Sequence, residues 1–353
     1  MDILSDKMPP ASAAEITKAT VAVVKSKVLV TGAAGFIGAH VAGECLRQGF
    51  DVVGVDDLSG GFLENVPPGA RFRQASVTDD AAMERLFATE QFDYVFHLGA
   101  YAAEGLSHFI RRFNYETNLG GSISLINAAV RHNVKCFFFT SSIAVYGRNQ
   151  LPMLEELTPQ PEDPYGVSKY AVELDLRAAH EMFGLNSVVF RPHNVYGELQ
   201  NIADKYRNVI GIFMNQLLQG KPMTIFGDGS QTRAFSYVGD MVGTMVRSVT
   251  MAECYGQVFN IGADQHYSVL ELAREVARAL ERPADILHLD ARNEVVHAYA
   301  SHAKVEKFFG PQPATSLADG LRRMAVWVKS VGVREPVRFK NIEIAKNLPP
   351  SWR

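Results

Sequence analysis

The chain has 353 residues, of which 47% are hydrophobic and 21% charged, and its formal net charge at pH 7 is −3. This composition is enough for a large buried core and predicts one large domain or two unequal ones. There is no long basic run, so nothing indicates binding to nucleic acid. No apolar stretch reaches the roughly 18 residues of a membrane-spanning helix. Three widely spaced cysteines, Cys45, Cys136 and Cys254, fit neither a disulfide framework nor a metal site, and they indicate buried thiols in a reducing cytoplasm.

Residues 1–26 mix charged and apolar side chains and lack the apolar core of a signal peptide, so we expect an N-terminal extension. Residues 27–192 alternate between strand and helix patterns. This regular alternation predicts an α/β fold with a doubly wound parallel sheet of the Rossmann type. The expected strands cover 28–31, 51–55, 71–75, 94–97, 136–141 and 187–191, and the expected helices 36–47, 79–89, 115–132 and 164–183.

The pattern loosens after residue 193. Loops rich in Asn, Gly and Asp alternate with helices expected near 207–219, 239–250, 268–281 and 315–330. We expect residues 193–340 to form a smaller α/β part that binds the substrate, with some segments returning to the first sheet. Residues 341–353 are expected to be a C-terminal tail.

Three glycines, Gly32, Gly35 and Gly38, follow the first expected strand and open the first expected helix at Phe36 and Ile37. This is the context that a dinucleotide-binding turn requires. The glycines permit a tight turn and a close approach of the backbone to a pyrophosphate. The helix N-terminus supplies N–H donors and a partial positive charge.

Asp56 ends the second expected strand, about 20 residues after the glycine turn, where an acidic residue is typical of such sites. A carboxylate there accepts hydrogen bonds from both ribose hydroxyls and repels a 2′-phosphate. NAD is therefore favoured over NADP as the cofactor. Asp57, the next residue, is interpreted as a turn residue.

Tyr165 and Lys169 lie four residues apart in an expected helix, so their side chains share one face. A cation beside a phenol favours the phenolate and lowers the tyrosine pKa from about 10. Such a tyrosine can take a proton from a substrate hydroxyl near neutral pH. The pair alone is a weak pattern, but downstream of a dinucleotide-binding turn it indicates hydride-transfer chemistry.

Together with the strand Thr140–Gly147, these motifs resemble the extended short-chain dehydrogenase/reductase family. Within that family the chain is similar to the nucleotide-sugar epimerases, the UDP-glucose 4-epimerase-like group. The resemblance runs from about residue 27 to 330. Further segments that carry it are His97–Ala100, Asn118, Arg191–Gly197 and Phe226–Gly229, the last leading to Arg233.

The resemblance implies a role for each residue. Tyr165 is the acid/base, Lys169 binds the nicotinamide ribose and lowers the tyrosine pKa, and Ser142 hydrogen-bonds the reacting sugar hydroxyl. The chemistry needs such a set, because hydride leaves a sugar carbon only as its hydroxyl loses a proton. NAD is regenerated within each cycle. Further cofactor contacts are expected from Leu98, Ala100 and Asn118, whereas Ser76 replaces the aspartate that commonly touches adenine.

Ile143 and Ala144, next to Ser142, separate the subclasses of this family. Sugar dehydratases carry an Asp-Glu pair at these positions, and decarboxylases carry Glu at the second one. Ile and Ala cannot move protons, so the sequence favours epimerisation at C4. The alternatives are a dehydratase or decarboxylase that uses another acid, for which Glu104 is the candidate, and a non-catalytic regulator that senses NAD. Intact Ser142 and Tyr165 argue against the regulator.

For the substrate, the resemblance implies that Asn194 contacts the diphosphate or sugar of a UDP-sugar and that Arg233 and Arg292 clamp its phosphates. Tyr206 and Arg207 lie in a polar loop that could cover it. The position that controls access of N-acetylated sugars matches Ala298, or Tyr299 if the alignment shifts by one residue. Ala298 predicts a roomy pocket for UDP-glucose or UDP-galactose, with UDP-GlcNAc or a UDP-uronic acid possible.

The family is commonly dimeric through two helices of the dinucleotide domain, so we expect a homodimer built on helices 115–132 and 164–183. Their apolar residues fit an ordinary core equally well. No metal ligand set is predicted, and neither nucleic acid nor a membrane is expected as a partner.

Overall fold

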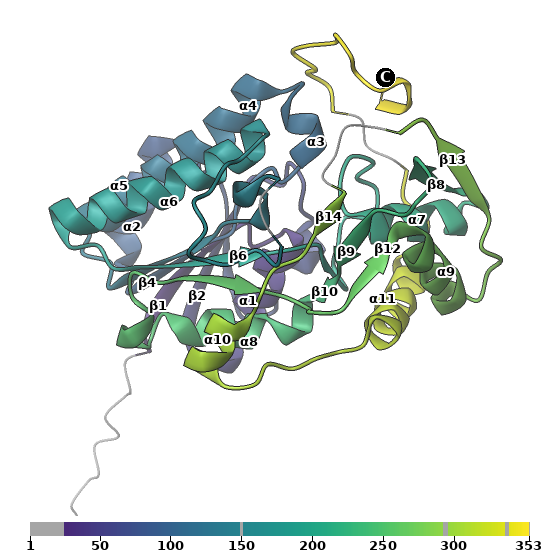
Figure 1. Ribbon diagram of the computed structural model, residues 1–353. Coiled ribbons are helices and arrows are strands. Elements are labelled where there is room, and N and C mark those ends of the chain that lie inside the picture. The colour runs from purple at the N-terminus through teal and green to yellow at the C-terminus, as the bar shows by residue number, and fades with distance from the viewer. Residues whose placement is uncertain (1–24, 149–150, 292–295, 336–338, 353) are drawn as a thin grey trace, which may run out of the picture.

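The computed structural model describes residues 25–148, 151–291, 296–335 and 339–352. Most of the expected N-terminal extension lies outside these residues. A parallel sheet of seven strands forms the centre, in the order β11-β6-β5-β4-β1-β2-β3 (Figure 1). Its strands are β1 (Lys27–Thr31), β2 (Asp51–Asp56), β3 (Arg71–Gln74), β4 (Tyr94–His97), β5 (Cys136–Thr140), β6 (Ser187–Pro192) and β11 (Val258–Ile261).

Helices cover both faces of this sheet (Figure 1). The central strands are mostly apolar because a parallel sheet is buried on both sides, and all five residues of β5 are buried. Leu29 and Phe137 face the helices of one layer, whereas Val28 and Phe138 face the other. The first layer contains α2 (Asp80–Glu90), α5 (Gly121–Arg131) and α6 (Pro164–Phe183), and the second α1 (Phe36–Arg47), α8 (Val242–Ser248) and α10 (Ala303–Phe309).

This architecture confirms the predicted doubly wound parallel sheet. The strand order reverses between β1 and β4, and a crevice forms at the carboxyl ends of strands at such a switch point. The single helix expected over 115–132 is instead α4 (Arg111–Tyr115), a π-helical turn (Glu116–Gly120) and α5. Two short helices, α3 (Glu104–Ser107) and α10, were not predicted.

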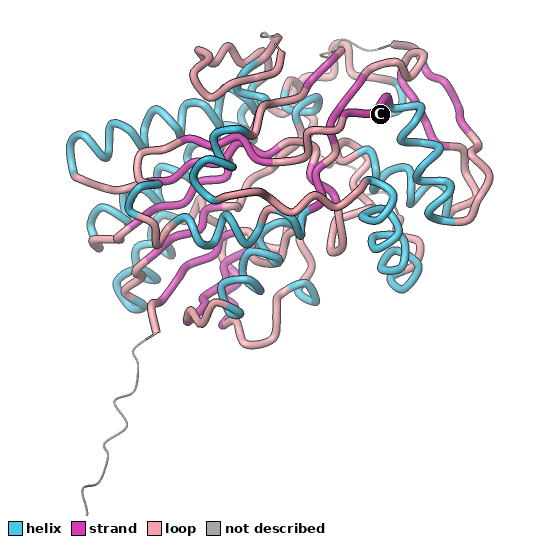
Figure 2. The backbone as a smooth tube through the Cα atoms, turned by 60° about the horizontal axis from the view of Figure 1, so that its bottom comes forward, coloured by secondary structure: helices cyan, strands magenta, loops and turns pink. Residues whose placement is uncertain are grey.

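A second group of elements lies at one end of the sheet (Figure 2). Helix α9 (Val269–Leu280) is amphipathic and begins with a capping box between Ser268 and Glu271. Its apolar side packs against α7 (Val209–Leu218) and α11 (Leu317–Val331). The small sheets pair β7 (Val195–Tyr196) with β10 (Ser236–Tyr237), β8 (Met223–Phe226) with β13 (Ile286–Leu289), and β9 (Thr232–Ala234) with β12 (His266–Ser268) and β14 (His297–Ala298).

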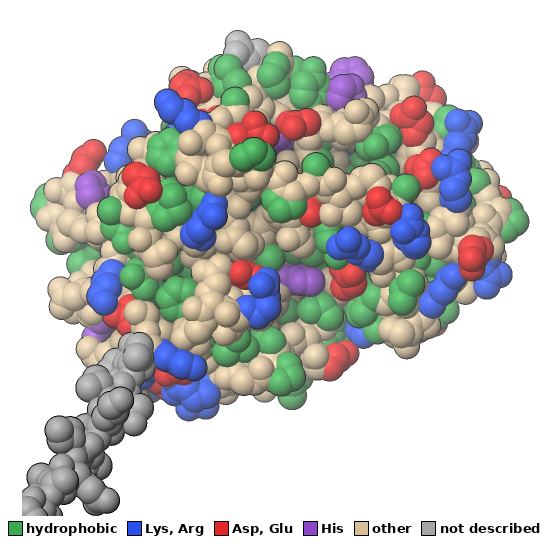
Figure 3. Space-filling view, turned by 90° about the horizontal axis from the view of Figure 1, so that it is seen from below, with side chains coloured by type: hydrophobic (Ala, Val, Ile, Leu, Met, Phe, Trp, Pro, Cys, Tyr) green, Lys and Arg blue, Asp and Glu red, His purple; other side chains and the backbone are tan. Residues whose placement is uncertain are grey.

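Segments after residue 193 also return to the main sheet, since β11 pairs with β6 and α8 packs on α1. The remaining elements are single 3₁₀ turns at Leu63–Asn65, Ile143–Tyr146, Val238–Asp240, Ala252–Cys254 and Pro350–Trp352. On the face in Figure 3, cationic and anionic side chains are interspersed. Within the described residues, no helix combines the length and apolar character needed to cross a membrane.

Candidate active site

A cleft of about 1650 Å³ lies at the carboxyl ends of the central strands and extends to the second group of elements. Both parts of the fold line it, so a ligand in the cleft would touch both. The residues predicted from the sequence that line it are Gly32, Gly35, Phe36, Ile37, Gly38, Asp56, Leu98, Ala100, Ser142, Tyr165, Lys169, Asn194, Arg233 and Ala298.

The glycine turn leaves room for a bound pyrophosphate. Gly32 has a φ of +70°, and a Cβ added there would lie 2.9 Å from the backbone nitrogen of Gly99. A Cβ on Gly38 would overlap the carbonyl oxygen of Gly32. Gly35 is the N-cap of α1, so this residue has no side chain to occupy the first N–H groups of the helix. The turn therefore fits the phosphates of a dinucleotide.

Asp56 is held at the end of β2 by two backbone N–H groups. Its Oδ1 accepts from Leu58 N at 2.7 Å, and its Oδ2 accepts from Ala34 N at 3.2 Å. Burial raises the pKa of this carboxyl, and the two backbone hydrogen bonds oppose that shift. The fixed carboxylate is placed to accept from ribose hydroxyls, as NAD requires. Asp57 accepts from Ser59 N at 2.9 Å, as a turn residue does.

A buried polar chain that was not predicted supports the loop after β4. Thr31 Oγ1 accepts from the backbone N–H groups of residues 98 and 99 and lies 2.8 Å from His97 Nδ1. His97 Nε2 lies 2.8 Å from Ser122 Oγ, which itself donates to Asn118 O. Burial lowers the pKa of His97 to about 3. The imidazole is therefore neutral, and the network assigns its proton to Nε2 because Ser122 Oγ can there only accept.

Asn118 does not line the cleft, which differs from the expected direct contact with the cofactor. Its amide is occupied by protein groups: Oδ1 accepts from Tyr101 N at 2.8 Å, and Nδ2 donates to Tyr101 O and to Asn114 Oδ1. Asn114 in turn donates to Pro164 O at 2.8 Å. Asn118 therefore positions the Tyr101 loop against the start of α6, the helix that carries Tyr165.

Helix α6 brings Tyr165 and Lys169 together with Ser142. It begins with Asp163 as N-cap, whose Oδ1 accepts from Gly166 N at 2.9 Å, followed by Pro164 at the first position. Lys169 Nζ lies 5.8 Å from the centre of the Tyr165 ring and donates to Thr140 O at 2.7 Å. Both side chains are buried, at 8% and 3% exposure. The Ser142 side chain forms a hydrogen bond with the Tyr165 hydroxyl.

The protein groups shift these pKa values differently from the sequence expectation. Burial raises the pKa of Tyr165, as do the charges of Glu104 and Asp163, while the Ser142 hydrogen bond and Arg207 lower it. Burial also lowers the pKa of Lys169 to about 7. A lysine this deeply buried is only partly protonated near neutral pH. Lys169 is therefore not the dominant influence on Tyr165, contrary to the prediction.

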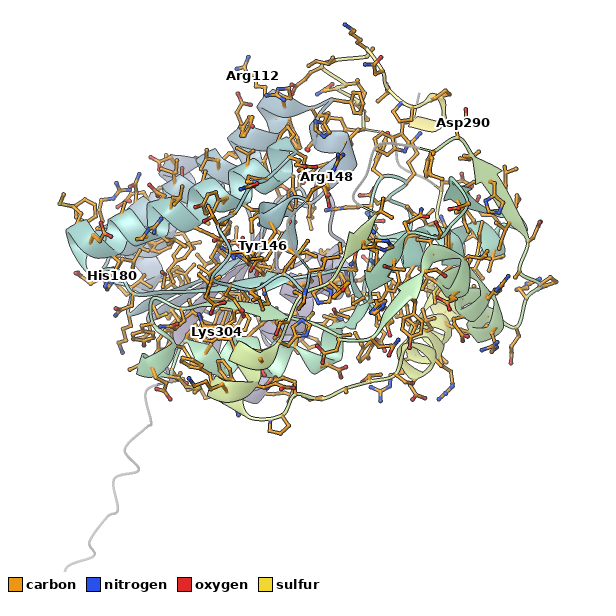
Figure 4. The ribbon with its side chains drawn as sticks, in the orientation of Figure 1. Arg112, Tyr146, Arg148, His180, Asp290 and Lys304 are labelled. Atoms are coloured by element: carbon orange, nitrogen blue, oxygen red, sulfur yellow. The ribbon has the colours of Figure 1, made fainter. Side chains whose placement is uncertain are left out.

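A buried ion pair behind Lys169 was missed from the sequence. Arg191 donates from Nε and Nη2 to the Glu173 carboxylate, at 2.9 Å and 2.5 Å, and from Nη1 to Tyr146 OH at 2.7 Å. Tyr146, labelled in Figure 4, also donates to Asn260 Oδ1 at 2.9 Å. This network joins α6 to β6 and β11. The spacing in the sequence could have indicated it. Glu173 lies four residues after Lys169, as Lys169 lies four after Tyr165, so all three share one face of the helix.

Ile143 and Ala144 line the cleft in the 3₁₀ turn that follows Ser142. The two positions therefore present apolar surface beside the reacting group. Glu104, the alternative acid, also lines the cleft, at the start of α3. Its charge acts on Tyr165, so it belongs to the surroundings of the acid/base.

The expected substrate residues come from separate loops. Asn194, with a φ of +41°, donates from Nδ2 to Ala234 O at 3.0 Å. Arg233 pairs with Ala298 in the small sheet and donates from Nη1 to Val296 O at 2.9 Å. Ala298 lines the cleft, whereas the Tyr299 ring stacks on His266 at 5.1 Å. Arg292 lies outside the described residues.

Two residues of the polar loop expected to cover the substrate also line the cleft. Tyr206 is buried, and Arg207 donates from Nε to Asp204 at 2.7 Å and lies over the Tyr101 ring. Among the residues that the structure describes, no group of three or more His, Cys, Asp or Glu side chains could hold a metal ion.

Fold and site together define a dinucleotide-dependent enzyme of the Rossmann class, in which Ser142, Tyr165 and Lys169 line the same cleft as the glycine turn. The model of the NAD dependent epimerase/dehydratase family matches residues 28–262. The chain therefore belongs to the NAD-dependent epimerase/dehydratase family, and its cofactor is NAD.

Known relatives agree with this assignment. The chain is 33% identical to the UDP-glucose 4-epimerase of Mycolicibacterium smegmatis over 84% of this chain and 96% of that protein. It is similar to the structure of UDP-glucose 4-epimerase from Thermotoga maritima with UDP-glucose, with a TM-score of 0.81, 32% identity, and coverage of 86% of this chain and 99% of that one. It is also similar to UDP-glucuronic acid 4-epimerase from Bacillus cereus with UDP-glucuronic acid and NAD, with a TM-score of 0.80, 28% identity, and coverage of 86% and 99%.

Proposed function

We propose that the protein is an NAD-dependent 4-epimerase of a nucleotide sugar, acting on UDP-glucose/UDP-galactose or a related UDP-hexose. The observation that carries this proposal is the grouping of Ser142, Tyr165 and Lys169 at one cleft with the glycine turn, while Ile143 and Ala144 stand beside them. Redox chemistry has its acid/base, but the two positions beside Ser142 have no acid to drive an elimination.

The proposed reaction uses one hydroxyl twice. The phenolate form of Tyr165, which burial disfavours and a positive charge beside the ring favours, takes the proton of the 4-hydroxyl, and Ser142 holds that oxygen by a hydrogen bond. Bound NAD would supply the acceptor for the C4 hydride and the source of its return to the opposite face. Tyr165 then gives its proton back to the same oxygen. Lys169 provides a donor to the nicotinamide ribose and, when protonated, positive charge behind the phenol.

Sugar selection is proposed to depend on Ala298, because its small side chain leaves space at the cleft wall. UDP-GlcNAc and UDP-uronic acids therefore stay within the proposed range. The diphosphate is proposed to bind near Asn194 and Arg233, which both line the cleft and lie close together, because Asn194 donates to the carbonyl of Ala234.

A dehydratase or decarboxylase is the second candidate, and Glu104 is the observation that favours it. This acid lines the cleft and its charge acts on Tyr165, so an acid is present although Ile143 and Ala144 are apolar. A regulator that only senses NAD is less well supported, because the complete catalytic group would have no use in it.

The test is product analysis with a panel of UDP-, GDP- and dTDP-sugars. Epimerisation leaves the product mass unchanged and inverts one carbon, which mass spectrometry and NMR detect together. A lighter product would contradict the epimerase proposal and favour elimination or decarboxylation. No conversion of any sugar, with NAD still bound, would favour the regulator.

We also propose a homodimer that pairs α5 and α6. Two large apolar side chains at the end of α6, Met182 and Phe183, are 74% and 66% exposed, and Ile123 and Leu174 add to the exposed surface of the two helices. Exposed apolar surface of this kind is typical of protein interfaces. A monomer in light scattering at micromolar concentration would contradict this proposal.

A cytoplasmic location is proposed as well. It is supported by three free, buried cysteines, Cys45, Cys136 and Cys254, which suit a reducing compartment.

Nucleic acid is not proposed as a partner. On the face shown in Figure 3, positive and negative side chains are interspersed and form no basic surface.

A further inference from the structure

The segment Phe339–Trp352, here called the C-terminal strap, lies against the cleft. It contributes five side chains to the cleft lining: Ile344, Lys346, Asn347, Pro349 and Trp352. The strap lies outside residues 28–262, which the family model matches. The Thermotoga maritima enzyme is matched over 99% of its length by only 86% of this chain, so this chain carries residues for which that enzyme has no counterpart.

Hydrogen bonds fix the strap to the helices beside Tyr165. The Glu343 carboxylate accepts from the backbone N–H groups of Arg112 and Phe113, at 2.8 Å and 2.9 Å, at the start of α4. Arg112 is labelled in Figure 4. In return, the backbone N–H groups of Glu343 and Ile344 donate to Phe109 O. These four bonds place the strap over α3 and α4.

An apolar cluster holds the far end of the strap. Trp352 is 6% exposed and meets the rings of Phe109 and Tyr206 edge to face. Its ring would lie 3.0 Å from a Cβ added to Gly105. Tyr206 OH also accepts from Phe339 N at 3.0 Å, so the covering loop and the strap are joined at two points.

The strap faces the residues that surround the acid/base. Glu104 and Arg207, whose charges act on Tyr165, line the same cleft as Lys346 and Asn347. The Trp352 ring lies against Gly105 and Tyr206, the chain neighbours of Glu104 and Arg207, so the strap lies at the end of the cleft that holds Tyr165. Asn347 has a φ of +62°, a backbone conformation that favours Asn or Gly.

We propose that the C-terminal strap is the outer wall of the sugar pocket and a specificity-determining part of the enzyme, holding the 4-keto sugar while it turns. The inference rests on the proposed epimerase function. A 4-keto sugar has lost a hydride to NAD and a proton to Tyr165. If it leaves at that stage, the sugar is released oxidised and the enzyme is left with NADH. The strap prevents this escape by closing the pocket.

The test compares the wild type with a variant truncated after residue 338, using UDP-glucose, UDP-GlcNAc and UDP-glucuronic acid. Expected results for the truncation are a KM raised at least about tenfold for the preferred sugar and a smaller difference between sugars. NADH should also build up on the enzyme during turnover, seen by its fluorescence, with keto sugar found in solution by mass spectrometry. Unchanged KM, selectivity and NADH level would overturn the proposal.

Point variants keep the test decisive if the truncation does not fold. Trp352→Ala removes the anchor, and Asn347→Gly removes one side chain that faces the cleft while keeping its backbone conformation. Each should raise KM and NADH build-up in the same direction, more weakly. Val326→Ser, at a 68% exposed position on α11, is the control and should match wild type. If all point variants match the control, the strap has only a structural role.

The two proposals fail in different ways. If the wild type epimerises no sugar, the proposed function itself is wrong. If the wild type is active and the strap variants equal it, only the inference about the strap is wrong.

Discussion

The two sides of the cleft are built differently. On the dinucleotide side, the site residues follow one another along β1, α1, β4 and α6 and are held by buried networks, such as the one from Thr31 through His97 to Ser122. On the substrate side, Asn194, Arg233 and Ala298 come from separate loops and small strands. The proposed acid/base group is thus fixed by the central sheet and its helices, while the proposed selectivity residues lie on segments that can change without disturbing the sheet.

The rigid side contains groups that work against folding. Lys169 is a buried amine whose protonation is opposed by burial, and Tyr165 is a buried phenol whose ionisation is unfavourable. Ala298, on the other side of the cleft, carries no buried ionisable group. If this comparison is right, variants on the dinucleotide side should change rate and stability strongly, and variants on the substrate side should mainly change selectivity.

The largest effect is expected from Tyr165→Phe. This change removes the acid/base hydroxyl but keeps the ring, so kcat for epimerisation should fall on the order of 10²–10⁴-fold while NAD remains bound. Initial rates and the NAD content of the purified protein measure both. Tyr170→Phe, five residues along the same helix, is the matched control and should keep the wild-type rate. Full activity in Tyr165→Phe would disprove the proposed mechanism.

Lys169→Met should lower activity and change how stability depends on pH. The pKa of Lys169 is about 7 in the folded protein, against about 10.4 when unfolded. Between these values the unfolded chain binds more protons, so this lysine destabilises the fold at low pH and the penalty disappears as pH rises through this range. Urea unfolding should therefore find the variant more stable than wild type near pH 6, with the gap closing by pH 10. A gap that does not vary with pH would show that Lys169 is not the group responsible.

Gly38→Ala tests how closely the start of α1 approaches the backbone of the glycine turn. The added methyl group would overlap the Gly32 carbonyl, so we expect a loss of about 1–3 kcal/mol in the free energy of unfolding and weaker NAD binding. Gly43→Ala on the same helix is the control. There the nearest atom is Pro67 Cβ at 4.0 Å, and the helix should become slightly more stable. Equal melting temperatures for the two variants would contradict the close approach.

Much of the dinucleotide side could be predicted from the sequence because its signals are local. The strand–glycine–helix order around Gly32 and the four-residue spacing of Tyr165 and Lys169 each depend on neighbours along the chain. The parallel sheet and the bounds of α6 follow from the same kind of pattern. Even the discontinuous part of this prediction, the meeting of Ser142 with Tyr165, is fixed by the topology of a doubly wound sheet.

The rest depends on contacts between distant residues. The role of Asn118 is set by its hydrogen bonds to the Tyr101 backbone, 17 residues earlier, and the Glu173–Arg191 pair becomes visible only when α6 packs on β6. The sequence predicted only a C-terminal tail where the strap lies, because the hydrogen-bond partners of Glu343 are 230 and 231 residues earlier in the chain. No periodicity in a single sequence encodes such pairings. The pKa of Tyr165 was misjudged for the same reason, because burial of the whole group exceeds the effect of one neighbour.

The smallest effect is expected from Ala298→Tyr, and it should fall on selectivity alone. Ala298 lines the cleft while Tyr299 is stacked on His266, so a large ring at 298 should narrow the pocket. We expect the ratio of kcat/KM for UDP-glucose over UDP-GlcNAc to rise about tenfold, typical of the size selection that one hydrophobic pocket achieves. The rate with UDP-glucose and the unfolding midpoint should remain close to wild type.

Tyr299→Ala is the matched comparison for this prediction, since it removes a ring that points away from the cleft. Its selectivity should not change. A shift with Tyr299→Ala and none with Ala298→Tyr would move the selecting position by one residue. It would also weaken the contrast between the two sides, because selectivity would then depend on a packed ring rather than on open space. If Ala298→Tyr lowered the unfolding midpoint as much as Gly38→Ala does, the contrast between the two sides would also be weakened. The wall of the cleft at residue 298 would then be packed as tightly as the glycine turn.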